Sequence, residues 1–295
     1  MPIPAPEHPV PVGPLAVRFL AYELPAMRAG TEVIASVELE NAGTATWRNL
    51  EAGHIQLSYH WLDRFGNPLV WDGLRTPLAA AVRPGERIEA WLRVAAPVPA
   101  GPYRLAIGLV SEQRLWLAEL GNVELTVDVD VLPRLARRAL AVEVADGPPA
   151  LVAATRAALA AQDEPPVAGG EAVAFLAPGC LPAPDWSRLV LDAHEEGYAA
   201  VAGSVAVEGG RLGARGLARE LAPWAPGFGR SPKWSLPLLC PSLVAGIVGG
   251  APWVEPVCGL PALDPGGLAE AWLCDGRIRV VVSATAARRA DRRRA

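Results

Sequence analysis

Three tryptophans in the first half of the chain are the residues most suited to contact a ligand. Trp71 and Trp116 lie near expected turns or strand edges, and Trp91 falls on the outer face of an expected strand. An exposed indole ring can stack on the apolar face of a sugar, and aromatic rings are also enriched in protein interfaces. Asp72 and Arg75 could flank such a surface or form an ordinary loop ion pair. Packing, a protein interface and a glycan platform all remain open.

The residues around these tryptophans are predicted to form β-strands. Between Leu15 and Val131 apolar and polar residues alternate with a period of two, which is typical of strands with one buried face. The alternation is clearest over residues 32–40, 54–61, 88–94 and 125–131. Gly, Pro and Asn lie between these segments, where the chain must turn. About seven short strands without crossover helices predict two packed antiparallel sheets, with Trp61 in the core and Trp47 closing one end.

Short motifs in this region resemble a known group of domains. The motifs are Asn-Ala-Gly-Thr-Ala-Thr-Trp at 41–47, Tyr-His-Trp at 59–61, Trp-Asp-Gly-Leu-Arg at 71–75, Arg-Pro-Gly at 83–85, Pro-Ala-Gly-Pro-Tyr at 99–103 and Leu-Trp-Leu at 115–117. Together they resemble bacterial Ig-like domains attached to cell-envelope glycan enzymes, and the tryptophan-rich Ig-like domain of autophagy receptors. The resemblance implies an Ig-like β-sandwich over residues 15–132, after an extended segment at 1–14.

The second half of the chain follows a different pattern. After a linker at 133–138, buried-strand patterns at 139–144, 172–176 and 197–205 alternate with helix-forming stretches at 150–162 and 187–196. This alternation predicts an α/β domain over residues 139–287, followed by a basic tail at 288–295. His194 is expected on a solvated polar face of the second helix.

Segments of this half resemble the centre of a family 2 glycosyltransferase of the GT-A fold. Residues 175–186 and 199–205 match the central frame, residues 266–275 the helix near its end, and residues 276–286 the closing strand. The resemblance implies an acidic motif that holds a divalent cation, but Ala177, Pro178 and Gly179 stand at that place. It also implies a donor pocket for which the segment before Ala177 is too short. We therefore expect a reduced, inactive domain without a metal or other cofactor.

The same resemblance implies a carboxylate that acts as general base beside the acceptor. Three residues are weak catalytic candidates for this role: Glu255, Asp264 and Glu270. Helix capping by Asp264 and simple surface exposure of Glu270 are the alternatives. An enzymatic activity is therefore disfavoured but left open.

Composition limits the class of protein. Hydrophobic residues make up 51% of the 295 residues and the net charge is −4, which fits a packed globular protein and gives no nucleic-acid footprint. The four cysteines form no CxxC pair and have no His at metal-ligand spacing, so reduced thiols and no metal site are expected. The N-terminus lacks the pattern of a secretory signal, and no stretch resembles a membrane span. The sequence thus predicts a soluble cytoplasmic protein.

These observations favour one functional hypothesis and leave two others. The first is a non-catalytic binding or scaffold protein, with a protein or glycan partner and a pseudoenzyme domain, associated with glycan or glycoconjugate biosynthesis. The second is an active glycosyltransferase with an unusual metal-independent site. The third is a structural subunit of a larger homo- or hetero-oligomeric assembly. The expected fold is multidomain: an all-β Ig-like sandwich followed by a reduced GT-A-like α/β domain.

Overall fold

Strands are the main regular secondary structure in the computed structural model of this chain. The structure describes residues 1–50, 53–208, 238–239, 242–244, 253–257, 260–263 and 271–282. The chain divides into two units, Met1–Leu132 and Pro133–Ala295. Among the described residues, no helix is both long enough and apolar enough to span a membrane.

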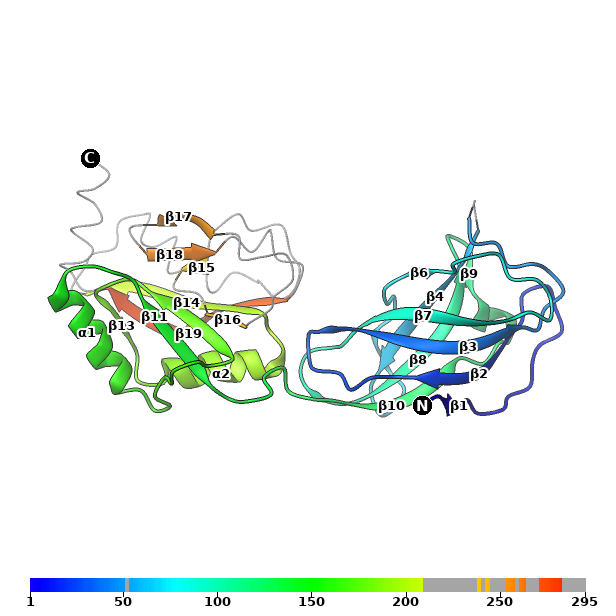
Figure 1. Ribbon diagram of the computed structural model, residues 1–295, viewed down its shortest axis with the longest axis horizontal. Helices are drawn as coiled ribbons and strands as arrows, with labels where there is room; N and C mark the ends of the chain where they lie inside the picture. The colour runs from blue at the N-terminus through cyan, green and yellow to red at the C-terminus, as the bar shows by residue number, and fades with distance from the viewer. Residues whose placement is uncertain are drawn as a thin grey trace. The chain divides into compact units, whose positions relative to one another are not determined.

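The first unit contains two antiparallel sheets that enclose one core (Figure 1). One sheet has the strand order β1-β2-β3-β7. Its strands are β1 (Ile3–Pro4), β2 (Val17–Glu23), β3 (Glu32–Asn41) and β7 (Arg87–Ala95). Strand β7 therefore lies at an edge of this sheet.

The other sheet of the first unit has the strand order β10-β8-β4-β5, and two short strands extend it. The main strands are β4 (Ile55–Leu62), β5 (Pro68–Val70), β8 (Gly101–Ser111) and β10 (Leu125–Val131). Strand β6 (Thr76–Pro77) pairs with β4, and β9 (Leu115–Trp116) pairs with β8 ahead of the short helix η1 (Leu117–Leu120). Short strands within segments 68–77 and 115–120 thus extend this sheet by pairing with β4 and β8.

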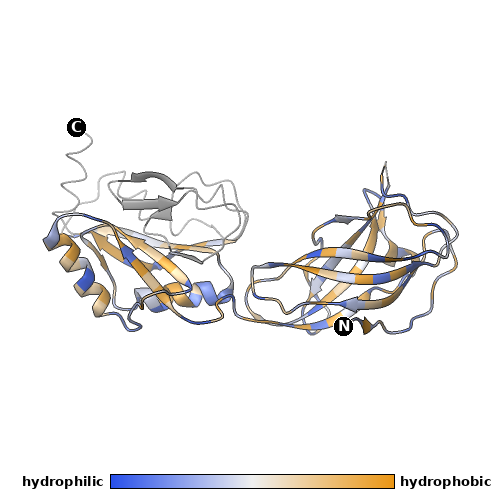
Figure 2. Ribbon diagram, viewed as in Figure 1, coloured by the Kyte–Doolittle hydropathy of each residue, from blue (hydrophilic) through white to orange (hydrophobic). Residues whose placement is uncertain are grey.

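The core of the first unit follows the alternation along the strands, which Figure 2 shows as alternating hydrophobic and hydrophilic colours. Trp47 and Trp61 are buried, as the sequence pattern predicts. Trp61 also links the two sheets, because its indole Nε1 donates a hydrogen bond of 2.8 Å to the carbonyl of Ala95 on β7. The Tyr59 hydroxyl accepts one of 2.8 Å from the Ala95 backbone N–H. Two large side chains of β4 therefore fix the end of β7.

The second unit is built mainly from strands. Its described elements are β11 (Leu140–Val144), α1 (Pro149–Ala160), β12 (Ala172–Leu176), β13 (Cys180–Pro182), α2 (Trp186–Glu196), β14 (Ala200–Val207), β15 (Leu238–Leu239), β16 (Ser242–Val244), β17 (Trp253–Val257), β18 (Leu260–Leu263) and β19 (Trp272–Val282). They form a sheet of order β11-β12-β16-β14-β19-β13 and a smaller sheet of order β15-β18-β17.

The prediction of a GT-A-like α/β domain for this unit is wrong. The described residues of this unit form two helices and nine strands. Only β11–β12 and β14–β19 pair in parallel, whereas β12–β16, β14–β16 and β13–β19 are antiparallel. The helix expected over residues 266–275 is also incorrect at its end, because Trp272 already begins β19. Trp, Ile and Val favour strands, and they recur along β19.

Candidate binding surface

Strand β4 is buried on both of its faces. Ile55, Leu57, Tyr59 and Trp61 point into the core, while Gln56, Ser58 and His60 point to the outer face of the sheet. All three of these polar residues are also buried. Polar residues on the outer face of an antiparallel sheet are normally solvated. A cover over this face must therefore hold them away from water.

Residues from the β5–β6 loop and from β9 form this cover. Together with His60 they make up a group that we call the Trp71 cluster: His60, Trp71, Asp72, Arg75 and Trp116. The His60 ring is stacked on Trp71, with ring centroids 4.1 Å apart and planes at 20°. On another side it contacts the Trp116 ring, with centroids 4.0 Å apart. The imidazole is therefore held between two indole rings and is only 2% exposed.

The ring nitrogens of His60 fix its orientation. Its Nδ1 contacts the backbone carbonyl oxygen of Trp71. Its Nε2 lies 3.3 Å from a carboxylate oxygen of Glu124, an ion-pair distance without hydrogen-bond geometry. Gly108 leaves room for this carboxylate, because a Cβ at position 108 would lie 2.7 Å from Glu124 Oε1. The histidine thus anchors the segment that carries Trp71 onto the sheet.

Arg75 ties the same segment to its surroundings. It donates hydrogen bonds of 2.7 Å to Asp72, 3.3 Å to Glu112 and 2.6 Å to the Ser58 hydroxyl. Its guanidinium also lies over the Trp116 ring, 4.9 Å from the ring centroid. A planar guanidinium has several donors and can bond several partners at once while it stacks on an aromatic ring. Arg75 therefore stabilises the loop between β5 and β6 and leaves little freedom to its neighbours.

The tryptophans that the sequence singles out have different environments. Trp116 is buried and packs in the cluster. Trp71 is 56% exposed although one face of its ring is covered by His60, so its other face is open to solvent. Trp91 is 61% exposed but lies on β7, in the other sheet. The structure brings together Trp71, Asp72, Arg75 and Trp116, and it leaves Trp91 apart.

Sequence reasoning missed His60, Ser58 and Glu112 as members of this surface. A signal for the first two was present, because the polar members of the alternation at 54–61 must share the outer face of β4. Glu112 gave no signal, because it reaches Arg75 only through the pairing of β4 with β8.

The three carboxylates considered as catalytic candidates lie where the structure describes no side chain. Glu255 lies in β17, where the backbone alone is described, and Asp264 and Glu270 lie outside the described residues. Gly179, in the position of the implied acidic motif, has a positive φ of 89° and forms a turn between β12 and β13. Over the described ranges, no group of His, Cys, Asp and Glu could hold a metal ion.

His194 is buried, so its expected solvated position is wrong. Its Nδ1 is 2.7 Å from the Tyr198 carbonyl and its Nε2 is 2.8 Å from the Ser242 hydroxyl. Burial lowers the pKa of this imidazole to about 4, so it is neutral at physiological pH. A neutral ring with a partner at each nitrogen joins α2 to β16, which is a structural role.

Arg138, in the predicted linker, connects three acidic residues of the second unit. It donates hydrogen bonds of 2.7 Å to both Glu164 and Asp192, and it contacts Glu195 more closely. The hydrogen bond from Arg138 lowers the pKa of the Glu164 carboxyl, and burial opposes this shift. Ion pairs that share one guanidinium form a network, which contributes more than an isolated surface pair.

We expect Arg138→Met to reduce the free energy of unfolding at pH 7 by about 1 to 2 kcal/mol, because it leaves clustered carboxylates without their cation. The lowered pKa of Glu164 means that the native state favours its ionised form, so this stabilisation is present at neutral pH and disappears as the carboxyl is protonated in acid. Urea unfolding of the unchanged protein and of Arg138→Met, at pH 7 and at pH 3, measures this stabilisation. Arg104→Met, which removes a more exposed pair with Asp128, is the control. A variant effect that is equal at both pH values would contradict this role.

Cys274 is expected to resist alkylation. Burial raises the pKa of its thiol to about 12, and the thiolate is the reactive form. Treatment of the folded protein with iodoacetamide near pH 8, followed by peptide mass spectrometry, should leave Cys274 unmodified, whereas the denatured protein should be modified there. Rapid labelling in the folded state would show that β19 opens readily.

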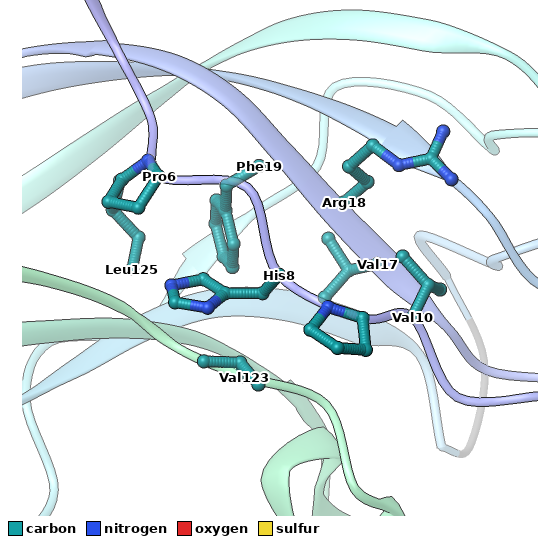
Figure 3. Close-up of a pocket in the computed structure, with 9 residues that line it drawn as sticks. Pro6, His8, Val10, Val17, Arg18, Phe19, Val123 and Leu125 are labelled. Carbon is teal, nitrogen blue, oxygen red and sulfur yellow. The ribbon is translucent and has the colours of Figure 1, made fainter.

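The pocket in Figure 3 is too small for an organic ligand. It is lined by the N-terminal segment with Pro6 and His8, by β2 with Phe19, and by Val123 and Leu125. Its volume is about 20 Å³, which is enough for a single water molecule. The open surface around Trp71 is the better candidate for recognition.

Comparisons with known proteins give no family for this chain. No protein-family model matches it, and no curated protein matches it. It has weak similarity to a solved C-terminal domain of wzt, with 10% identity over 45% of this chain and 84% of that chain and a TM-score of 0.31. For a beta-glucosidase from Listeria innocua in complex with glucose, the identity is 12% over 39% of this chain and 15% of that chain, with a TM-score of 0.26. For the CARDB domain of PF1109 from Pyrococcus furiosus, the identity is 15% over 39% of this chain and 84% of that chain, with a TM-score of 0.24. These TM-scores are too low to support a structural or functional argument.

Proposed function

We propose that this protein is a non-catalytic binding protein and that the Trp71 cluster recognises a glycan. The observation that carries the proposal is a tryptophan ring with one face immobilised on a buried histidine and the other face open. Such a ring loses little conformational entropy when a ligand stacks on it. Because sugar rings have an apolar C–H face, an open indole face is a suitable platform for them.

Polar groups beside Trp71 support the choice of a glycan. The Asp72 side chain is 63% exposed, and only its Oδ1 is bonded to Arg75. Its Oδ2 has no hydrogen-bond partner within the described part of the chain and can accept one from a sugar hydroxyl. Arg75 keeps this carboxylate in place. An aromatic platform with a few oriented polar groups is the usual composition of a small-molecule site.

The state of the charged groups supports binding without catalysis. Arg75 is engaged by Asp72, Glu112 and Ser58, and His60 is buried between two indole rings. A general acid or base must reach the reacting atom of a substrate, and the buried imidazole of His60 cannot. The proposal includes a cytoplasmic location, a reducing compartment in which the Cys274 thiol stays reduced.

The proposal is tested by applying the full-length protein to an array of immobilised oligosaccharides. We expect saturable retention on a subset of glycans that share an exposed apolar sugar face, and competition by the same soluble glycans. Retention that tracks only glycan charge and vanishes in moderate salt would indicate non-specific adsorption and contradict the proposal.

A further inference from the structure

Strand β7 has an edge that is only partly covered. On one side it pairs with β3 along its whole length. On the other side, the Arg93 N–H donates a hydrogen bond of 3.2 Å to the Thr76 hydroxyl, and the Ala95 N–H donates to Tyr59. Figure 1 shows β7 between β3 and β6. The cover is therefore confined to the end of β7 near β6.

The hydrogen bonds of Arg93 and Ala95 show to which side the other backbone groups of β7 point. In an antiparallel ladder, alternate residues direct both N–H and C=O to the same side. Glu89 and Trp91 have the same parity as Arg93 and Ala95, so their backbone groups point to this open edge. Within the described residues, no hydrogen bond is formed by the backbone of Glu89 or Trp91 at this edge. Unpaired edge groups of this kind are a template for another strand.

A groove runs beside the open edge. It has a volume of about 240 Å³ and lies between residues 76–82 and the first half of β7. Buried Leu78 and Val82 contribute to its apolar lining. Trp91, Glu86 and Glu89 also line it and are exposed to solvent. The groove therefore combines an apolar floor with an aromatic ring and two carboxylates.

Charge indicates which occupant the groove fits. The Glu89 carboxylate has no ion-pair partner among the described residues, and the Glu86 carboxylate accepts a hydrogen bond of 2.8 Å from the Arg83 backbone N–H. Their negative charges favour a cationic side chain, and the exposed Trp91 ring can add a cation–π contact. A second copy of this chain would bring the same two carboxylates to the interface, so charge favours a different partner.

We propose that the β7 edge binds an extended basic segment of another protein by strand addition. The backbone of that segment pairs with Glu89 and Trp91, its apolar side chains enter the groove, and its Lys or Arg side chains meet Glu86 and Glu89. Main-chain hydrogen bonds give affinity in this mode, and alternate side-chain pockets give specificity. This site is separate from the Trp71 cluster and does not depend on glycan recognition there.

The test uses the full-length protein and a short capped peptide of alternating Lys and Val, measured by isothermal titration calorimetry. We expect Glu89→Lys and Trp91→Ala each to weaken peptide binding by about tenfold or more. Ile34→Ala is the matched control, because Ile34 is 60% exposed on the same face of the sheet but does not line the groove. The Ile34→Ala variant should bind the peptide with the same affinity as the unchanged protein. Trp71→Ala should also leave peptide binding unchanged, which separates this proposal from the glycan proposal.

A second probe tests the backbone pairing itself. Two versions of the peptide, one N-methylated at every Lys and the other at every Val, keep its charge. In one of them the methyl groups face β7 and prevent a ladder, so we expect the binding of that version to be lost. Equal affinity for both methylated versions and the unmethylated peptide would overturn strand addition. Failure of the unmethylated peptide to bind, or self-association of the protein in sedimentation that Trp91→Ala abolishes, would overturn the choice of a basic partner.

Discussion

Replacement of Trp71 by alanine is expected to weaken glycan binding by at least about tenfold, and to abolish it if stacking is the main contact. The indole ring supplies the open apolar face, and its removal also exposes the His60 ring on which it rests. The dissociation constants of the unchanged and variant proteins, measured by calorimetry with a glycan retained on the array, give the effect.

Trp91→Ala is the matched control for this prediction. Trp91 is the same residue type with a similar exposed fraction, and it lies on the other sheet. Glycan affinity should therefore be unchanged in that variant. If Trp91→Ala weakened glycan binding as much as Trp71→Ala does, the open face of Trp71 would not be the recognition surface.

Replacement of Trp61 by alanine is expected to reduce the free energy of unfolding of the first unit by about 3 to 5 kcal/mol. Trp61 is fully buried and its Nε1 bonds the Ala95 carbonyl across the core. The variant therefore leaves a cavity and an unpaired acceptor. Urea unfolding followed by circular dichroism measures the change.

Trp61→Phe separates the two contributions. It keeps most of the ring volume but lacks the Nε1 donor. We therefore expect it to reduce the free energy of unfolding, but by less than Trp61→Ala does. A loss below about 1 kcal/mol for Trp61→Ala would contradict a core held between the two sheets.

The sandwich could be predicted from the sequence because its signal is local. Alternation with a period of two assigns the inward residues of each strand, and Trp61 lies on the inward side of 54–61. The burial of Trp116 could not be found in this way. It depends on the pairing of β9 with β8 and on Arg75, which reaches the Trp116 ring from another part of the chain.

In the second unit, the positions of individual elements were predictable and their arrangement was not. The patterns at 139–144, 172–176 and 187–196 correspond to β11, β12 and α2. Strand β16, however, inserts between β12 and β14 through pairings distant in sequence. The resemblance placed a helix at 266–275 before a strand at 276–286, yet β19 runs continuously from Trp272 to Val282, with an irregularity in its pairing at Gly203 and Ser204. Short-range patterns carry no information on such long-range pairing.

Part of the candidate surface was predictable for the same reason. Trp71, Asp72 and Arg75 lie close together in sequence, and a turn at that point brings them near one another. Recognition of His60 as their support required knowledge of which segment covers β4. Long-range packing, rather than residue type, gives Trp71 its fixed orientation.

The most direct test of the proposed function is a titration of the ¹⁵N-labelled protein with a retained glycan, followed through the indole N–H resonances of its tryptophans. We predict progressive shifts of the Trp71 indole resonance and of the Asp72 and Arg75 backbone amides, with the Trp91 indole resonance unchanged. Saturation of binding without a shift at Trp71, or with shifts confined to other residues, would contradict recognition by the Trp71 cluster.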